Sequence, residues 1–118
     1  MKIKVSEASD KVLDYLVAMV EGHEPQWSAD AETFYMGVRS AYCFLSEYAP
    51  STDWAQGGPI IEREGIDVMP MFHFKPTGWQ AQVPGTCYSG PTPLIAAMRC
   101  FVASKLGDEV DVPAELPQ

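Results

Sequence analysis

The chain has 118 residues, 47% of them hydrophobic and 20% charged, and its formal net charge is −8. This length corresponds to one domain with a real core, and the composition is typical of a soluble globular protein rather than a disordered one. The eight basic residues are scattered along the chain, which excludes nucleic acid as an expected partner. No apolar run approaches the ~20 residues that a membrane-spanning helix needs, so no membrane partner is expected either.

The cysteines and the first residues indicate a cellular compartment. Cys43, Cys87 and Cys100 form no CxxC pair and are odd in number. The opening MKIKVSEASD is charged and polar, unlike a signal peptide. These features predict a reduced, cytoplasmic protein.

The first elements expected in chain order are a strand and a helix. Residues 2–5 alternate between polar and apolar, which is the period of a half-buried strand. Ser6 or Ser9 can then cap a helix that extends to about Glu21, because a serine side chain accepts free N–H groups of the first turn. Gly22 is the predicted end of this helix, since glycine tolerates a left-handed backbone. Four apolar residues form its buried face: Leu13, Leu16, Val17 and Val20.

The middle of the chain is less regular. Residues 23–53 carry many aromatic side chains and are expected to be mixed in structure, with an irregular loop over residues 48–54. A short helix is expected from Pro59 to about Glu64, because proline suits the first helical turn. Gly65 is its predicted stop.

A hairpin and a last helix are expected to follow. Residues 68–74 are extended in character and residues 79–83 alternate, with a turn at residues 76–78 between them. In the last helix Thr92 is the N-cap, Pro93 the first helical residue and Gly107 the stop. The final stretch, residues 108–118, is interpreted as an acidic, proline-containing tail with room for a short strand.

This order of elements predicts the fold class. A strand, a helix, a mixed region, a hairpin and a second long helix favour segregated elements over repeated βαβ units. We therefore expect an α+β fold in which a small antiparallel or mixed sheet is packed by two main helices, in a single domain over residues 1–118.

Catalytic and metal-binding patterns are weak. His23 and His73 are the only histidines, and neither lies in a recognisable nucleophile–base arrangement. The histidines and cysteines have no spacing typical of a zinc site, and Glu62 and Glu64 lie two residues apart, so they do not face each other on a helix. The phosphate-binding patterns GxxxxGK[ST] and GxGxxG are absent. The sequence favours a protein that is not an enzyme, with no cofactor and no metal.

A binding site has more support. Two predicted helices begin beside glycine and proline, at GGP (residues 57–59) and at SGPTP (residues 89–93). Helix N-termini favour anions, because free N–H groups and the helix dipole both point at the ligand. Trp54, Trp79 and Tyr88 lie near loops and strand starts, where flat rings can stack on a nucleobase.

The structural alternative is equally concrete. Arg63 could pair with a phosphate through its planar fork, but the tryptophans could equally be partly buried core. The GGP stretch could be a tight turn, which Asp53 would hold through hydrogen bonds to the backbone. Both interpretations stay open at the level of the sequence.

Three blocks of sequence resemble a known family. KIKVSE…LDYLVA…EG, STDWAQGGPIIERE and TPLIAAMRCFVASKLGDEVDVP are similar to the NinX-like family of small proteins from tailed phages and prophages. The resemblance is nearly full-length, and the middle and last blocks are the most specific. It implies a phage origin and action in the cytoplasm of the bacterial host. The resemblance carries no established activity and no catalytic residue. It therefore implies which positions of this chain correspond to the family, but not what those residues do.

Two main classes of function follow. The first is a non-catalytic phage accessory protein that captures a nucleotide-derived small molecule, a host immune signal, by analogy with small acidic sponge proteins. The second is a protein–protein adaptor or inhibitor of a host or phage replication or defence protein, which would use the acidic tail and exposed aromatic residues. An enzyme that degrades such a signal is a third hypothesis.

For the first class, one wall of the site is expected to consist of Ser51, Thr52, Asp53, Trp54, Gln56, Gly57, Gly58 and Arg63. A second wall, which could come from a neighbouring subunit of a homo-oligomer, would consist of Trp79, Tyr88, Gly90 and Thr92. In this hypothesis Trp54 stacks on the base, Asp53 or Gln56 reads its polar edges, and the helix starts hold phosphates.

Overall fold

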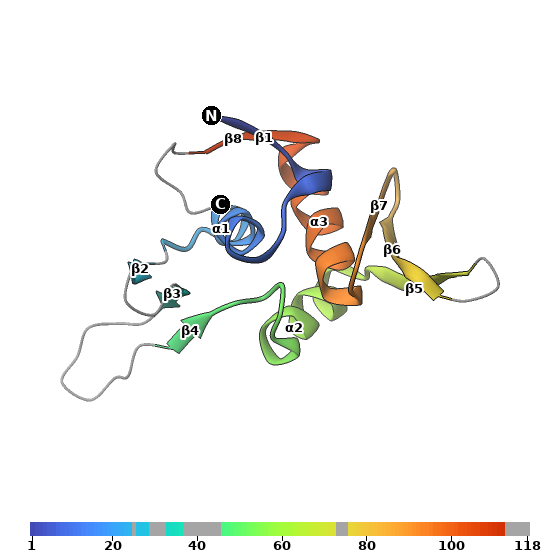
Figure 1. The fold of residues 1–118 in the computed structure, drawn as a ribbon, viewed down its shortest axis with the longest axis horizontal. Helices are drawn as coiled ribbons and strands as arrows, with labels where there is room; N and C mark the ends of the chain where they lie inside the picture. Colours follow the sequence, from blue (N-terminus) through green and yellow to red (C-terminus); the bar gives the residue numbers. More distant parts are fainter. Residues whose placement is uncertain (25, 29–32, 37–45, 73–75, 113–118) are drawn as a thin grey trace.

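The fold is known from a computed structural model that describes residues 1–24, 26–28, 33–36, 46–72 and 76–112 (Figure 1). These residues form three α-helices, one short 3₁₀-helix and three small antiparallel sheets. The predicted α+β class is confirmed. Two main helices were expected, whereas the described part of the chain has a third of almost equal length.

Helix α3 (Pro93–Leu106) is the centre of the molecule. In Figure 1 it runs between one of the sheets and the other two helices, all of which it contacts. Its side chains are buried nearly all round, which is typical of a helix inside a core. The predicted caps are confirmed: Thr92 Oγ1 accepts the N–H of Ile95 at 3.1 Å, and Gly107 ends the helix.

Helix α1 (Asp10–Glu21) presents its apolar face to α3. Gly22 ends it in the left-handed conformation, with φ 76°, as predicted. Ser9 occupies the N-cap position, but its side chain makes no capping hydrogen bond. Before α1, strand β1 (Lys2–Lys4) is one residue shorter than expected, because Val5 begins a 3₁₀-helix (Val5–Glu7) that buries its side chain.

Helix α2 (Trp54–Glu64) starts earlier than the sequence predicted. The expectation of a helix from Pro59 is wrong because Asp53, and not the proline, begins it: Asp53 Oδ1 accepts the N–H of Ala55 at 3.0 Å. Pro59 lies inside the helix at an exposed position. Gly65 ends the helix in the left-handed conformation, as predicted.

A three-stranded sheet covers one side of α3. Strands β5 (Asp67–Phe72), β6 (Pro76–Val83) and β7 (Thr86–Gly90) are antiparallel in the order β5-β6-β7. The predicted hairpin is confirmed, but residues 76–78 belong to β6 and not to a turn. Strand β7 was not expected, and residues 73–75, including His73, lie outside the described part.

The second sheet joins the two ends of the chain. Strand β8 (Glu109–Asp111) pairs antiparallel with β1, placing Lys2 opposite Asp111 and Lys4 opposite Glu109. Val110 and Val112 are buried, so the first part of the expected tail belongs to the core. The short strand expected there is confirmed, and residues 113–118 lie outside the described part.

The third sheet consists of β2 (Gln26–Ser28), β3 (Thr33–Met36) and β4 (Ser46–Tyr48), in that order. It leads into α2 through residues 49–53. These residues are the loop that was expected at residues 48–54, without its first and last residue.

Candidate functional site

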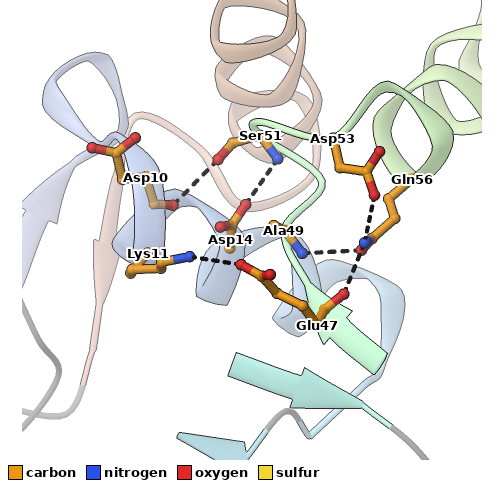
Figure 2. A network of polar contacts seen from close by, with 8 residues as sticks. All are labelled: Asp10, Lys11, Asp14, Glu47, Ala49, Ser51, Asp53 and Gln56. Atoms are coloured by element: carbon orange, nitrogen blue, oxygen red, sulfur yellow. Dashed lines mark hydrogen bonds and ion pairs between the residues drawn. The ribbon is translucent and has the colours of Figure 1, made fainter. Parts of the chain in front are cut away.

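Residues 47–56 form a polar hub between α1 and α2, at the first predicted wall (Figure 2). Ser51 is fully buried there. Its N–H donates to Asp14 Oδ1 at 2.8 Å, and its hydroxyl donates to the carbonyl of Asp10 at 3.3 Å. Ser51 therefore fixes the loop to α1.

Gln56 and Asp53 complete the polar hub. Gln56 Oε1 accepts the N–H of Ala49 at 3.0 Å, and its Nε2 donates to the carbonyl of Glu47 at 2.8 Å and to Asp53 Oδ2 at 2.9 Å. Both carboxylate oxygens of Asp53 thus accept hydrogen bonds from within the fold. The side-chain polar atoms of Asp53 and Gln56, which were expected to bind a ligand, are therefore already hydrogen-bonded within this segment.

At the starts of α2 and α3, backbone N–H groups likewise donate hydrogen bonds to other atoms of the chain. Gly57 lies inside α2, and its N–H donates to the carbonyl of Asp53 at 2.9 Å. At α3, the Thr92 hydroxyl oxygen accepts a hydrogen bond from the N–H of Ile95. The expected phosphate cradle at Gly57 and Gly58 would lie inside α2, because the helix starts three residues before Gly57.

Close packing explains two of the predicted glycines. A Cβ on Gly57 would lie 2.4 Å from the carbonyl oxygen of Pro50 and 2.6 Å from Leu94 Cδ2. A Cβ on Gly90 would lie 2.8 Å from the backbone nitrogen of Ala96. Gly57 of α2 therefore packs against the backbone of Pro50 and the Leu94 side chain of α3, and Gly90 packs against the backbone of α3.

Trp54 differs from its neighbours in the predicted wall. Its side chain is 57% exposed on the first turn of α2. Thr52 is also exposed, and Gly58 is half-buried with open space around it. This surface is accessible, although the polar groups beside it are engaged.

Arg63 lies at the far end of α2. It donates to Glu21 Oε1 at 2.8 Å and to Glu64 Oε2 at 2.9 Å, and its guanidinium lies over the Phe101 ring at 5.7 Å. Hydrogen bonds from Arg63 and from Lys105 lower the pKa of the Glu64 carboxyl. Arg63 joins the C-terminal ends of the helices, away from the polar hub.

The second predicted wall lies on β6, on β7 and at the start of α3. Trp79 on β6 is half-buried and packs against the core. The Tyr88 hydroxyl donates a hydrogen bond to Asp108, just beyond the end of α3. Burial is the largest cause, and this hydrogen bond the second, of a rise in the pKa of Tyr88 to about 12. Trp79 pairs with Gly90 across β6 and β7, and Thr92 follows at the N-cap of α3, so the structure brings these three residues together, whereas the Tyr88 hydroxyl reaches the other end of α3.

A large hollow lies away from both predicted walls, at the N-terminus. This N-terminal hollow has a volume of about 820 Å³. Its lining consists of Met1, Lys2, Ile3, Lys4, Glu7, Ala8, Ser9, Asp10, Lys11, Val12 and Trp27. None of the twelve predicted residues contributes to it, whereas Tyr88 lines a smaller hollow of about 420 Å³ beside Asp108.

The N-terminal hollow carries both signs of charge, because Glu7 and Asp10 line it together with three lysines. Three of the eight basic residues of the chain line it, namely Lys2, Lys4 and Lys11. Lys2 and Lys4 are exposed on the same face of β1, and neither forms an ion pair among the described residues. Trp27 adds a partly exposed indole. The grouping of lysines within the first eleven residues was the sequence signal that could have found this hollow.

Lys11 links the N-terminal hollow to the polar hub. Its ammonium nitrogen lies 3.5 Å from Glu47 Oε1 (Figure 2). The preceding residue, Asp10, has a positive φ of 48°, a conformation that is uncommon for a residue with a side chain. The Ser51 hydroxyl holds the carbonyl of this same residue.

Asp14, three residues after Lys11 on α1, carries a buried carboxyl group. Its side chain is fully buried, and its Oδ2 has no hydrogen-bond partner within the described ranges. Burial raises the pKa of Asp14 to about 6, against the opposing effect of the hydrogen bonds with Ser51.

Metal ligands do not gather in the described part of the chain, which contains no group of three or more His, Cys, Asp or Glu side chains arranged to hold an ion. None of the helices in that part combines the length and the apolar character that crossing a membrane requires.

Comparison with known proteins identifies the family. The family model for NinX of bacteriophage P22 matches residues 4–105, which include α1, α2 and all but the last residue of α3. No curated protein matches the chain. Since the matched segment covers well over half of the sequence, this phage protein belongs to the bacteriophage P22 NinX family.

Proposed function

We propose that this NinX-family protein is a non-catalytic phage accessory protein that binds and sequesters a nucleotide-derived small molecule in the cytoplasm of the bacterial host. The observation that carries the proposal is the N-terminal hollow, where Lys2, Lys4 and Lys11 line the same space as Trp27. The proposed binding site is therefore this hollow, and no longer the polar hub of residues 47–56.

Charge and shape support an anionic aromatic ligand. The chain carries a net charge of −8, whereas the described lining of this hollow has three lysines against two carboxylates, Glu7 and Asp10. Lysine binds phosphate as a point charge, and an indole can stack on a nucleobase of any sequence. In this proposal the lysines hold the phosphates and Trp27 holds the base.

A thermal-shift screen against nucleotides, cyclic nucleotides and ADP-ribose derivatives tests the proposal. A ligand that binds only the folded state at ~100 times its dissociation constant stabilises the protein by about 2.7 kcal/mol, which is a clear shift for a small domain.

Variants of the hollow locate the ligand. Lys2→Gln combined with Lys4→Gln, and Trp27→Ala separately, are expected to abolish the shift. Arg63→Gln combined with Lys105→Gln is the matched control, because it removes the same charge at the C-terminal ends of α2 and α3. A well-folded protein with no shift for any compound would exclude this function.

Trp54 favours a second candidate function, that of an adaptor or inhibitor that docks on a host or phage replication or defence protein. Tryptophan is enriched among residues that dominate binding energy at interfaces, and this one is more than half exposed. Trp54→Ala should then lose a protein partner in a pull-down from infected cells while keeping ligand binding. An unchanged set of captured proteins would argue against the adaptor.

We also propose, as a hypothesis carried over from the sequence, that the protein forms a homo-oligomer. Sedimentation equilibrium tests this directly, and Trp54→Ala shows whether this exposed side chain contributes to the association. A monomer at all concentrations would contradict it.

A further inference from the structure

We propose that anion binding in the N-terminal hollow is linked to proton uptake by Asp14, because the Lys11 ammonium group lines the hollow, pairs with Glu47 and is carried one helical turn before Asp14 on α1. The inference rests on the proposed function, since the competing anion is the ligand of this hollow. It adds a regulatory property, namely an affinity that rises as the pH falls.

Lys11 is the shared cation. It lines the N-terminal hollow, and its Nζ lies 3.5 Å from Glu47 Oε1 on β4. Asp14 lies three residues further along α1, and side chains at this spacing are neighbours on a helix surface. The positive charge of Lys11 favours the ionised form of Asp14. An anion in the hollow would therefore draw on a charge that already pairs with Glu47 and acts on Asp14 through space.

The surroundings of Asp14 make its charge sensitive to such competition. On α1 it faces Lys11, which stabilises its negative charge, and Asp10, which opposes it. From the loop before α2, the backbone N–H of Ser51 donates to Oδ1, while Oδ2 has no hydrogen-bond partner in the part of the chain that is described. From β4, Tyr48 packs nearby, and its own pKa is raised by burial first and then by acidic neighbours that include Asp14.

The sign of the linkage follows from these charges. An anion beside Lys11 cancels the main cationic support of the Asp14 carboxylate and adds a like charge nearby, so ligand binding raises the pKa of Asp14. Linkage is reciprocal, so protonation of Asp14 raises the affinity for the anion. The affinity should increase about tenfold for each unit by which the ligand raises this pKa, mainly as the pH falls through about 6.

Isothermal titration calorimetry with a cyclic dinucleotide tests this inference. Its phosphodiesters keep their charge between pH 5 and pH 8, so any proton that is taken up belongs to the protein. Titrations at pH 5.0, 6.0, 7.0 and 8.0 in two buffers with different ionisation enthalpies count the protons. The wild type should take up protons near pH 6 and bind several-fold more tightly at pH 5 than at pH 8.

Three variants separate the groups involved. Asp14→Asn should remove the proton uptake, and Glu47→Gln should strengthen binding by up to about fivefold at all pH values, because one competitor for Lys11 is lost. Asp67→Asn, an exposed carboxylate on β5, is the control and should behave like the wild type. Because Glu47 is exposed, its variant keeps the test decisive even if Asp14→Asn does not fold.

The failures can be told apart. Binding with pH-independent affinity and no proton uptake would overturn the linkage and leave the proposed function standing. Proton uptake that persists in Asp14→Asn would assign the proton to another group and overturn the role of Asp14. The absence of binding at every pH would overturn the proposed function and the linkage together.

Discussion

The polar hub at residues 47–56 and the N-terminal hollow have opposite characters. In the hub, the polar atoms of Ser51, Asp53 and Gln56 are bonded to the fold itself, and the glycine fits against backbone. In the hollow, Lys2 and Lys4 are exposed and form no ion pair with the described residues. A stretch rich in polar residues and glycine is therefore more informative about function when its polar groups are not already hydrogen-bonded within the fold.

The strongest effect is expected at Gly57, the glycine that directly follows the hub. Gly57→Ala should destabilise the protein by about 3 kcal/mol, because the new Cβ would lie 2.4 Å from the carbonyl oxygen of Pro50. Gly58→Ala is the matched control: its Cβ meets nothing within 4 Å, so better helix propensity should stabilise by about 0.5–1 kcal/mol. Urea denaturation of both variants measures the difference. Equal stabilities would mean that α2 does not pack on residue 50 in this way.

The next effect concerns the buried charge beneath the hub. Burial raises the pKa of Asp14 to about 6, so the folded protein binds this proton more tightly than the unfolded chain. The stabilisation is fully present below the unfolded pKa near 4 and is lost as the pH rises through 6, a change of up to about 3 kcal/mol.

Asp14→Asn keeps an oxygen acceptor for the N–H of Ser51 and removes the titration. The difference in unfolding free energy between variant and wild type, measured from pH 4 to pH 7.5, should therefore shift in favour of the variant as the pH rises. A difference that stays constant with pH would show that Asp14 does not titrate in this range.

The weakest effects come from two surface cations that should behave in opposite ways. Arg63→Gln removes exposed ion pairs with Glu21 and Glu64, so it should cost about 0.5–1 kcal/mol of stability and leave ligand binding unchanged. Lys2→Gln should leave stability unchanged and weaken ligand binding several-fold. Thermal denaturation and calorimetric titration of both variants check this pair of expectations. A loss of binding in Arg63→Gln would return the ligand to the first predicted wall.

The elements that the sequence predicted well are those with local signals. The apolar periodicity of α1 and the Thr92, Pro93 and Gly107 pattern of α3 determine these helices through caps and a buried face, which depend on neighbouring residues alone. The hairpin of β5 and β6 was readable from alternation in the same way.

The start of α2 was mispredicted because two local signals compete there. Pro59 is typical of a first helical turn, but the Asp53 cap and the close contact of Gly57 with Pro50 place the start five residues earlier. The pairing of β1 with β8 joins residues more than 100 positions apart, so no local pattern could predict it.

The candidate site was missed although most of its lining lies within the first twelve residues. Lys2 and Lys4 come from β1, Lys11 from α1 and Trp27 from β2, and only the folded chain brings them to one hollow. The aromatic and glycine signals at residues 51–58 were real, but they report the packing of α2 against α1 and α3.

Chemical-shift mapping by nuclear magnetic resonance separates the N-terminal hollow from the polar hub in a single titration. A ¹⁵N-labelled sample titrated with a cyclic dinucleotide reports on the backbone amides and on the indole N–H groups of Trp27 and Trp54 separately. We expect shifts at residues 2–12 and at the Trp27 indole, with little change at residues 51–58. Shifts confined to residues 51–58 and the Trp54 indole would refute binding in the hollow and restore the polar hub as the binding site.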